Sequence, residues 1–162
     1  MSTNYYLKRI PTQEEINNCK SCLEAGRLED NSSCWQSDFE IGKDDSVQYW
    51  LDKMTAKIHI GKAADGWKFL FRTHEDIYNS NLSSVFQFLG EQISSGLWKL
   101  IDEYDSDVDL KKFKELVKDT MKTGIDINEY WKKYPERNTG WGGGPEQYTS
   151  FDGSRWWNTD FF

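Results

Sequence analysis

The chain has 162 residues, a formal net charge of -7 and 8 Trp among its 15% aromatic residues. This length suits a single domain over residues 1–162, and the large rings supply much of the area that its core buries. The acidic balance disfavours direct binding of nucleic acid, and the apolar runs fall short of the roughly 18 residues that a membrane helix needs.

The cysteine content and the first residues indicate a cytoplasmic protein. Three cysteines are an odd number, which argues against a disulfide framework and for a reducing compartment. The first ten residues, MSTNYYLKRI, lack the apolar segment of a signal peptide.

The first predicted elements are a strand at residues 4–10 and a helix that follows it. Thr12 with Glu15 three residues later is a capping box, which marks a helix start. The spacing of three apolar residues then predicts one buried helix face, formed by Ile16, Cys19 and Leu23. After a polar, turn-rich stretch, a second short helix is predicted at residues 47–54.

Residues 57–63 and 67–73 are predicted to form a β-hairpin, because Asp65-Gly66 between alternating apolar residues is a strong signal for a two-residue turn. Such a turn pairs Lys62 with Phe69 and Ile60 with Phe71. Alternation then places the apolar side chains on one face, toward the core: Ile58, Ile60, Trp67, Phe69 and Phe71. The other face carries the polar side chains of Lys57, His59, Lys68, Arg72 and His74.

Downstream, apolar spacing predicts helices at residues 81–93, 108–122 and 127–134 and a strand at 97–104. Residues 135–162 combine Gly with many rings, and we expect this tail to pack along the domain as irregular or edge-strand structure. The predicted fold class is α+β, a small antiparallel sheet with helices packed on one face.

The hairpin is basic although the chain is acidic. Residues 57–74 carry four Lys or Arg and one Asp, so their charge is +3 and that of the remainder is -10. The polar face is therefore predicted to bind a small anion, with open backbone beside it and rings nearby to stack on a base. The predicted ligand-binding residues are His59, Gly61, Lys62, Lys68, Arg72, Tyr5, Tyr6 and Trp98. The alternative is an ordinary solvated face whose cations pair with acids of neighbouring strands.

A structural zinc ion is a second prediction. Cys19-x-x-Cys22 supplies two soft ligands, and His59 and His74 are diagonal neighbours on the polar face of the predicted hairpin. Cys34 is a rival third ligand. The alternative is that these are buried, reduced cysteines on a helix face.

Five short motifs occur in one order along most of the chain: Thr3-Asn4-Tyr5-Tyr6, Cys19-x-x-Cys22, His59-Ile60-Gly61-Lys62, Gly66-Trp67-x-Phe69 and Asp102-Glu103-Tyr104. The combination resembles a group of small bacteriophage-encoded proteins that begin with Gly-Thr-Asn-Tyr-Tyr and share the later motifs. Ser2 and Asp105 stand where that group has Gly, and a longer segment separates the cysteines from His59. The resemblance implies a phage accessory protein in the host cytoplasm, and counter-defence is a frequent role of such proteins.

The favoured function is a counter-defence protein that binds a small anionic ligand, for example a nucleotide immune signal, without catalysis. One alternative is an acidic inhibitor that binds a host defence protein directly. A second is a small hydrolase in which His59 is the general base and Asp102 or Glu103 orients it. The sequence leaves open the ligand, the host target and the oligomeric state.

Overall fold

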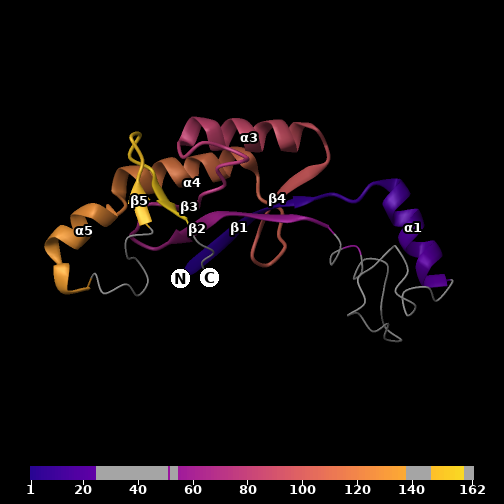
Figure 1. Ribbon diagram of the computed structural model, residues 1–162, viewed down its shortest axis with the longest axis horizontal. Coiled ribbons are helices and arrows are strands. Elements are labelled where there is room, and N and C mark those ends of the chain that lie inside the picture. Colours follow the sequence, from indigo (N-terminus) through magenta and orange to yellow (C-terminus); the bar gives the residue numbers. More distant parts are fainter. Residues whose placement is uncertain (25–50, 52–54, 138–146, 159–162) are drawn as a thin grey trace. The chain divides into compact units, whose positions relative to one another are not determined.

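The structure is a computed structural model that describes residues 1–24, 51, 55–137 and 147–158 (Figure 1). By its internal contacts the chain divides into two compact units, Lys8–Lys57 and a larger one that combines Met1–Leu7 with Ile58–Phe162. That the two form one domain stays a prediction. No helix in the described ranges is long and apolar enough to cross a membrane.

The smaller unit contains helix α1 (Gln13–Glu24). Its start is the predicted capping box: the Glu15 N–H donates to Thr12 Oγ1 at 3.2 Å, and the Thr12 N–H donates to Glu15 Oε2 at 2.9 Å. Cys19 is 2% exposed, as predicted for the buried side of this helix. The helix predicted at 47–54 lies outside the described residues except for Leu51, which is helical.

The described strands form one six-stranded sheet in the order β4-β1-β2-β3-β6-β5. The strands are β1 (Ser2–Arg9), β2 (Lys57–Ala64), β3 (Leu70–Arg72), β4 (Trp98–Asp102), β5 (Gln147–Thr149) and β6 (Arg155–Trp157). β2 and β3 are antiparallel, as are β5 and β6, whereas β3 and β6 run parallel. The mostly antiparallel sheet with its helices confirms the predicted α+β class.

The hairpin turn lies where it was predicted, but the strands beyond it are offset by one residue. The Trp67 N–H donates to the Ala64 carbonyl across Asp65-Gly66, as a two-residue turn requires. Farther on, Lys62 lies opposite Leu70 rather than Phe69, and Gly61 lies opposite Phe71. The predicted pairs are therefore wrong by one position.

A bulge at Lys68 and Phe69 explains this offset. The Lys68 N–H donates to the Ile125 carbonyl and the Phe69 N–H donates to Thr120 Oγ1, so neither bonds to β2. The extra residue lets Phe69 and Phe71 keep their predicted places in the core. It also shortens the second strand of the hairpin from the predicted 67–73 to β3.

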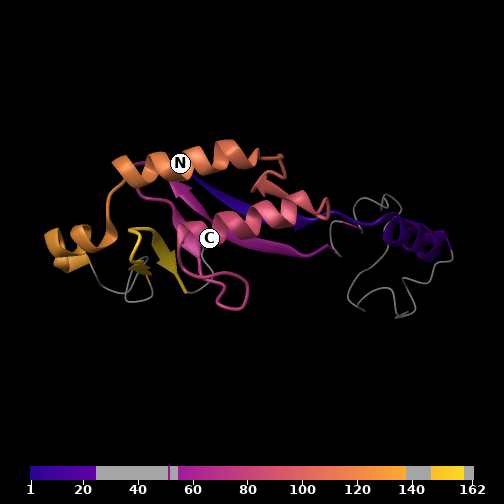
Figure 2. The same ribbon diagram turned by 90° about the horizontal axis from the view of Figure 1, so that it is seen from above.

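The core lies between the sheet and helices α3 (Leu82–Ser94) and α4 (Leu110–Thr123), which cover one face of the sheet (Figures 1 and 2). Both helices begin at a side-chain cap, since Asn81 accepts the Ser84 N–H and Asp109 accepts the Lys112 N–H. The fully buried side chains include Leu7, Ile60, Phe69, Phe71, Val85, Leu89, Phe113, Val117 and Trp156. These two helices thus pack on one face of the sheet, as predicted.

The described part of the tail supplies two strands. β5 lies at the edge of the sheet, as expected, whereas β6 lies inside it between β3 and β5. The short helix α5 (Ile127–Lys133) precedes the tail and lies beside β5, and a 3-10 turn (Pro135–Arg137) follows the helix (Figure 2). The tail therefore contributes to the core and also to the opposite face of the sheet.

Candidate functional site

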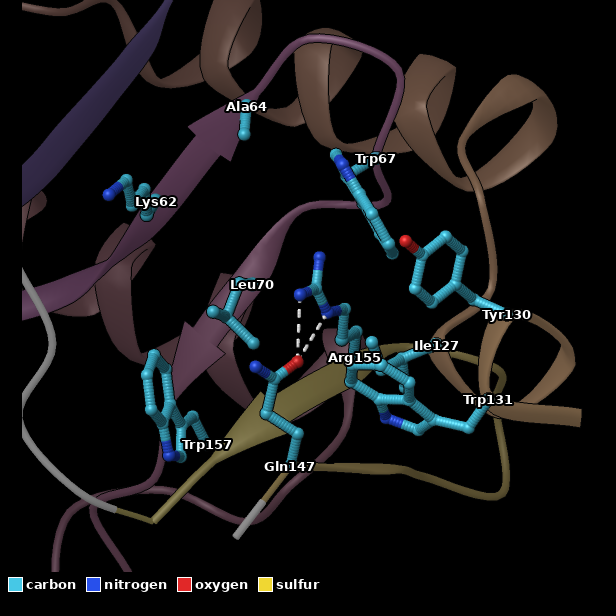
Figure 3. Close-up of a pocket in the computed structure, with 10 residues that line it drawn as sticks. All are labelled: Lys62, Ala64, Trp67, Leu70, Ile127, Tyr130, Trp131, Gln147, Arg155 and Trp157. Atoms are coloured by element: carbon cyan, nitrogen blue, oxygen red, sulfur yellow. Dashed lines mark hydrogen bonds between the residues drawn. The ribbon is translucent and has the colours of Figure 1, made fainter. Parts of the chain in front are cut away.

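A hollow of about 330 Å³ lies over the sheet face that α3 and α4 leave open (Figure 3). We call it the Arg155 pocket. Its floor comes from four strands, and the floor side chains are those of Lys62, Leu70, Gln147, Arg155 and Trp157. Its side wall comes from Trp67 and from the α5 residues Ile127, Tyr130 and Trp131.

The strand register explains why the floor side chains meet. Residues opposite one another on neighbouring strands share a face of the sheet. Leu70 of β3 lies opposite Lys62 of β2 and Arg155 of β6, and Gln147 of β5 lies opposite Trp157. The intervening residues, Phe71 and Trp156, point to the other face and enter the core. One face of β6 thus serves the pocket and the other serves the core.

The most unusual group in the pocket is the guanidinium of Arg155, a residue that is only 8% exposed. Its Nε and Nη2 donate to Gln147 Oε1 at 2.9 and 2.7 Å, and its Nη1 donates to the Lys68 carbonyl at 3.4 Å. The guanidinium carbon lies 4.9 Å from the centre of the Trp67 ring, which adds a cation–π contact. All these partners are neutral, and within the described ranges no carboxylate forms an ion pair with Arg155.

Arg155 nevertheless stays charged near neutral pH. Burial lowers its pKa to about 10, and the nearby carboxylate of Asp126 opposes that shift. A buried cation with neutral partners is costly, because the interior replaces only part of the lost hydration. The pocket therefore contains positive charge that a bound anion would compensate.

The aromatic wall is held in place by contacts between the β2–β3 turn and the start of α5. Trp67 bridges to Ile125, and its ring meets the ring of Tyr130 edge-on at 4.9 Å. Asp126 accepts the backbone N–H groups of the first turn of α5 and pairs with Lys68 at 3.2 Å. Because both sides of this junction are fixed, the rings form a preorganised surface.

The Asp126 junction predicts a pH dependence of stability. Burial raises the pKa of Asp126, but hydrogen bonds from the Glu129 N–H, from Lys68 and from the Asn128 N–H together hold the pKa below its usual value. A carboxylate with a lowered folded-state pKa stabilises the protein above its unfolded-state pKa, and this stabilisation is lost as the pH falls through the folded-state pKa.

We therefore expect the melting temperature of the wild type to fall more between about pH 7 and about pH 3 than that of an Asp126→Asn variant. Asparagine keeps the helix cap but carries no titrating charge. The measurement is thermal melting followed by circular dichroism, and equal losses in the two proteins would contradict the assignment.

Among the eight residues predicted to bind a ligand, Lys62 lines the Arg155 pocket. Tyr5 instead lines a second hollow of about 540 Å³ on the side of α4, where it packs against Phe69 and Phe113. Trp98 is half-buried against the core.

Three further predicted residues have other surroundings. Lys68 pairs with Asp126. Arg72 lies opposite Trp157, and its carbonyl accepts the Tyr78 hydroxyl at 2.8 Å. The backbone at Gly61 is not open as predicted, because the space where a Cβ would lie is filled by the Phe69 ring and the Leu70 carbonyl.

The remaining two predicted residues, His59 and Tyr6, lie together. Their rings stack with centres 4.9 Å apart. His59 Nε2 and Asn4 Oδ1 are 3.2 Å apart, and Asn4 Nδ2 donates to Glu103 Oε2 at 3.1 Å. Glu103 thus reaches His59 through an amide, whereas Asp102 caps the turn after β4 by accepting the Tyr104 and Ser106 N–H groups.

The residues of the predicted zinc site are only partly described. His74 Nε2 lies 2.8 Å from the His59 carbonyl, while Cys19 belongs to the smaller unit. The side chain of Cys22 and all of Cys34 fall outside the described residues. Within the described residues, no group of three or more His, Cys, Asp and Glu side chains is placed to hold a metal ion. The zinc site stays a prediction.

Sequence reasoning missed most of the Arg155 pocket. Arg155, Gln147 and Trp157 belong to the tail, which was expected to provide packing, and Tyr130 and Trp131 belong to a short helix with no assigned role. One signal was available. In the run Arg155-Trp156-Trp157, a strand places Arg155 and Trp157 on one face and Trp156 on the other, so large side chains occupy both faces.

Fold and pocket together define an α+β protein with an aromatic, cationic pocket on the open face of its sheet. Comparison with known proteins yields no match: no family model, no curated protein and no solved structure is significantly similar to this chain. The resemblance to phage accessory proteins therefore stays a prediction that rests on the five motifs.

Proposed function

We propose that this protein is a non-catalytic binding protein whose Arg155 pocket takes a small organic anion with a planar ring. The observation that supports it most is the buried guanidinium of Arg155, which has neutral partners and an aromatic surround. An anion placed against this group regains the interaction that burial removed, and charge-assisted hydrogen bonds are stronger than neutral ones.

The walls indicate the rest of the ligand. Trp67, Tyr130, Trp131 and Trp157 present ring surface around the cation. Stacking on such rings is favourable for any planar molecule, whatever its hydrogen-bonding pattern. The volume of about 330 Å³ is near the lower end of the usual range for ligand pockets, about 300–1,000 Å³. A molecule with one ring system fits these dimensions.

The chemistry of the lining supports binding rather than catalysis. The described lining of the Arg155 pocket contains no His, Cys, Ser, Asp or Glu, which leaves Lys62 and Tyr130 as its candidates for proton transfer or nucleophilic attack. The hydrolase alternative has weaker support, since Asn4 separates His59 from Glu103.

The biological part of the proposal rests on the motif resemblance. A phage accessory protein with such a pocket would act in the host cytoplasm by sequestering a small signalling molecule of a defence system. The net charge of -7 suits this role, because it disfavours long polyanions that would compete for the pocket.

Binding is tested by isothermal titration calorimetry with two anionic probes, adenosine monophosphate and indole-3-acetate, and with their neutral counterparts, adenosine and indole. We expect saturable binding of at least one anion and weaker binding of its neutral counterpart. Arg155→Met should lower the affinity for the anion by about tenfold or more, which is the range for loss of a charge-assisted contact.

The matched control is Lys99→Met, which removes one positive charge from β4, a strand distant from β5 and β6 in the sheet order. It should change affinity by less than about twofold, since an exposed charge acts weakly at a distance. If neither anion binds, or if Arg155→Met binds them as well as the wild type does, the proposed function is wrong.

A further inference from the structure

The hydrogen bonds of Arg155 indicate how many anionic groups the pocket can accept. A guanidinium has five N–H donors, and three of them are used by Gln147 Oε1 and the Lys68 carbonyl. One N–H on each terminal nitrogen has no acceptor within the described part of the chain. Two such donors match two oxygens of one carboxylate or one phosphate.

The charges around the pocket do not favour a second anionic group. Among the described lining residues Lys62 is the one other cation, and it is half-buried on β2. Lys68 is close by, but Asp126 neutralises it at 3.2 Å, and the Asp126 carboxylate also acts on Arg155. The chain as a whole carries -7. A second or third phosphate would therefore meet a negative field without a buried partner.

We propose that the ligand is an aromatic molecule with a single terminal anionic group, of the nucleoside monophosphate class, and that added phosphates weaken its binding. This inference rests on the proposed function and specifies the ligand of the same pocket. In such a complex the base would stack on the wall formed by Trp67 and the α5 rings, and the phosphate would meet the guanidinium of Arg155. Figure 3 shows these rings and the guanidinium around the pocket. Cyclic dinucleotides, which have two bases and two phosphates, exceed both the volume and the charge of this site.

The test compares adenosine mono-, di- and triphosphate by isothermal titration calorimetry in about 0.15 M salt. We expect affinity to fall by at least about threefold with each added phosphate, because each added charge is uncompensated. Attraction by a diffuse positive surface would produce the opposite order, with the triphosphate binding best.

Asp126→Asn is the diagnostic variant. It keeps the cap of α5 but removes a negative charge and leaves Lys68 without its counter-ion. In this variant the ratio of the affinities for the monophosphate and the triphosphate should shrink by about threefold or more. An unchanged ratio would overturn the explanation by local charge.

Two results separate this inference from the proposed function. If affinity is equal or rises with phosphate number while Arg155→Met still weakens binding by about tenfold or more, the single-anion inference is wrong and the binding function stands. If indole-3-acetate binds through Arg155 and adenosine monophosphate does not, the nucleotide class is wrong and the pocket stands. Absence of binding by both probes overturns the proposed function itself.

Discussion

Replacement of Trp156 by alanine is expected to lower the free energy of unfolding by about 3–5 kcal/mol, the range for removal of a fully buried aromatic side chain. Trp156 is 0% exposed and stacks on Phe71 with ring centres 4.9 Å apart. Its Nε1–H donates to Ser154 Oγ at 2.7 Å, so the polar edge of the ring is also satisfied. Urea unfolding followed by circular dichroism measures this loss.

The comparison with Trp157→Ala makes the result specific. Trp157 is the next residue on β6, but it faces the Arg155 pocket and is only half-buried. We expect Trp157→Ala to lower the free energy of unfolding by about 1–2 kcal/mol, because less of the Trp157 side chain leaves water on folding. The same variant should also weaken ligand binding. If the two variants lost similar stability, or if Trp156→Ala cost less than about 1 kcal/mol, β6 would not belong to the core as described.

Local sequence signals predicted the local structure well. The Thr12–Glu15 capping box, the Asp65-Gly66 turn and the apolar spacing of α3 and α4 each depend on residues a few positions apart. For such elements the backbone hydrogen bonds and the buried face are set by neighbours in the chain. The helix bounds agree with the prediction within two residues.

The site could not be predicted equally well, because it depends on contacts between distant segments. β6 lies parallel to β3, and no periodicity within either strand specifies that pairing. The bulge at Lys68 and Phe69 depends on Ile125 and Thr120, which accept the N–H groups that β2 would otherwise bind. An offset of one residue in the strand register changes which side chains lie opposite each other.

The predicted basic face and the observed pocket are therefore related but different. His59 contacts Asn4 and Tyr6 of β1. Arg72 instead lies opposite Trp157 of β6. Arg155, the residue best placed to bind a ligand, belongs to the tail. The rings of the tail predicted packing against the domain and gave no indication of a binding site.

Gly61→Ala is expected to destabilise the protein by about 3 kcal/mol, the upper end of the usual range for overpacking. A Cβ at this position would lie 2.4 Å from the Leu70 carbonyl oxygen and 2.4 Å from Phe69 Cε1. The first of these atoms is backbone in the adjacent strand, and the second belongs to a fully buried ring. Neither can move away without disturbing the sheet or the core.

Gly90→Ala is the matched control for this prediction. Gly90 lies within α3, and a Cβ there would meet nothing within 4 Å. Alanine has the higher helix propensity, so this variant should gain about 0.5–1 kcal/mol, again measured by urea unfolding. Opposite signs for the same substitution at two glycines would show that steric contact, rather than the residue change itself, determines the effect.

The Gly61 variant also distinguishes two roles for the glycine in the His59-Ile60-Gly61-Lys62 motif. If its purpose were to leave room for a ligand, alanine would weaken binding of the probes while the free energy of unfolding stayed near that of the wild type. If its purpose is to admit the Phe69 ring, the folded fraction of the variant should bind the probes within about twofold of the wild type, although the protein unfolds at lower urea concentration. The contacts of Gly61 favour the second outcome, because its own side of the strand is already occupied by the core.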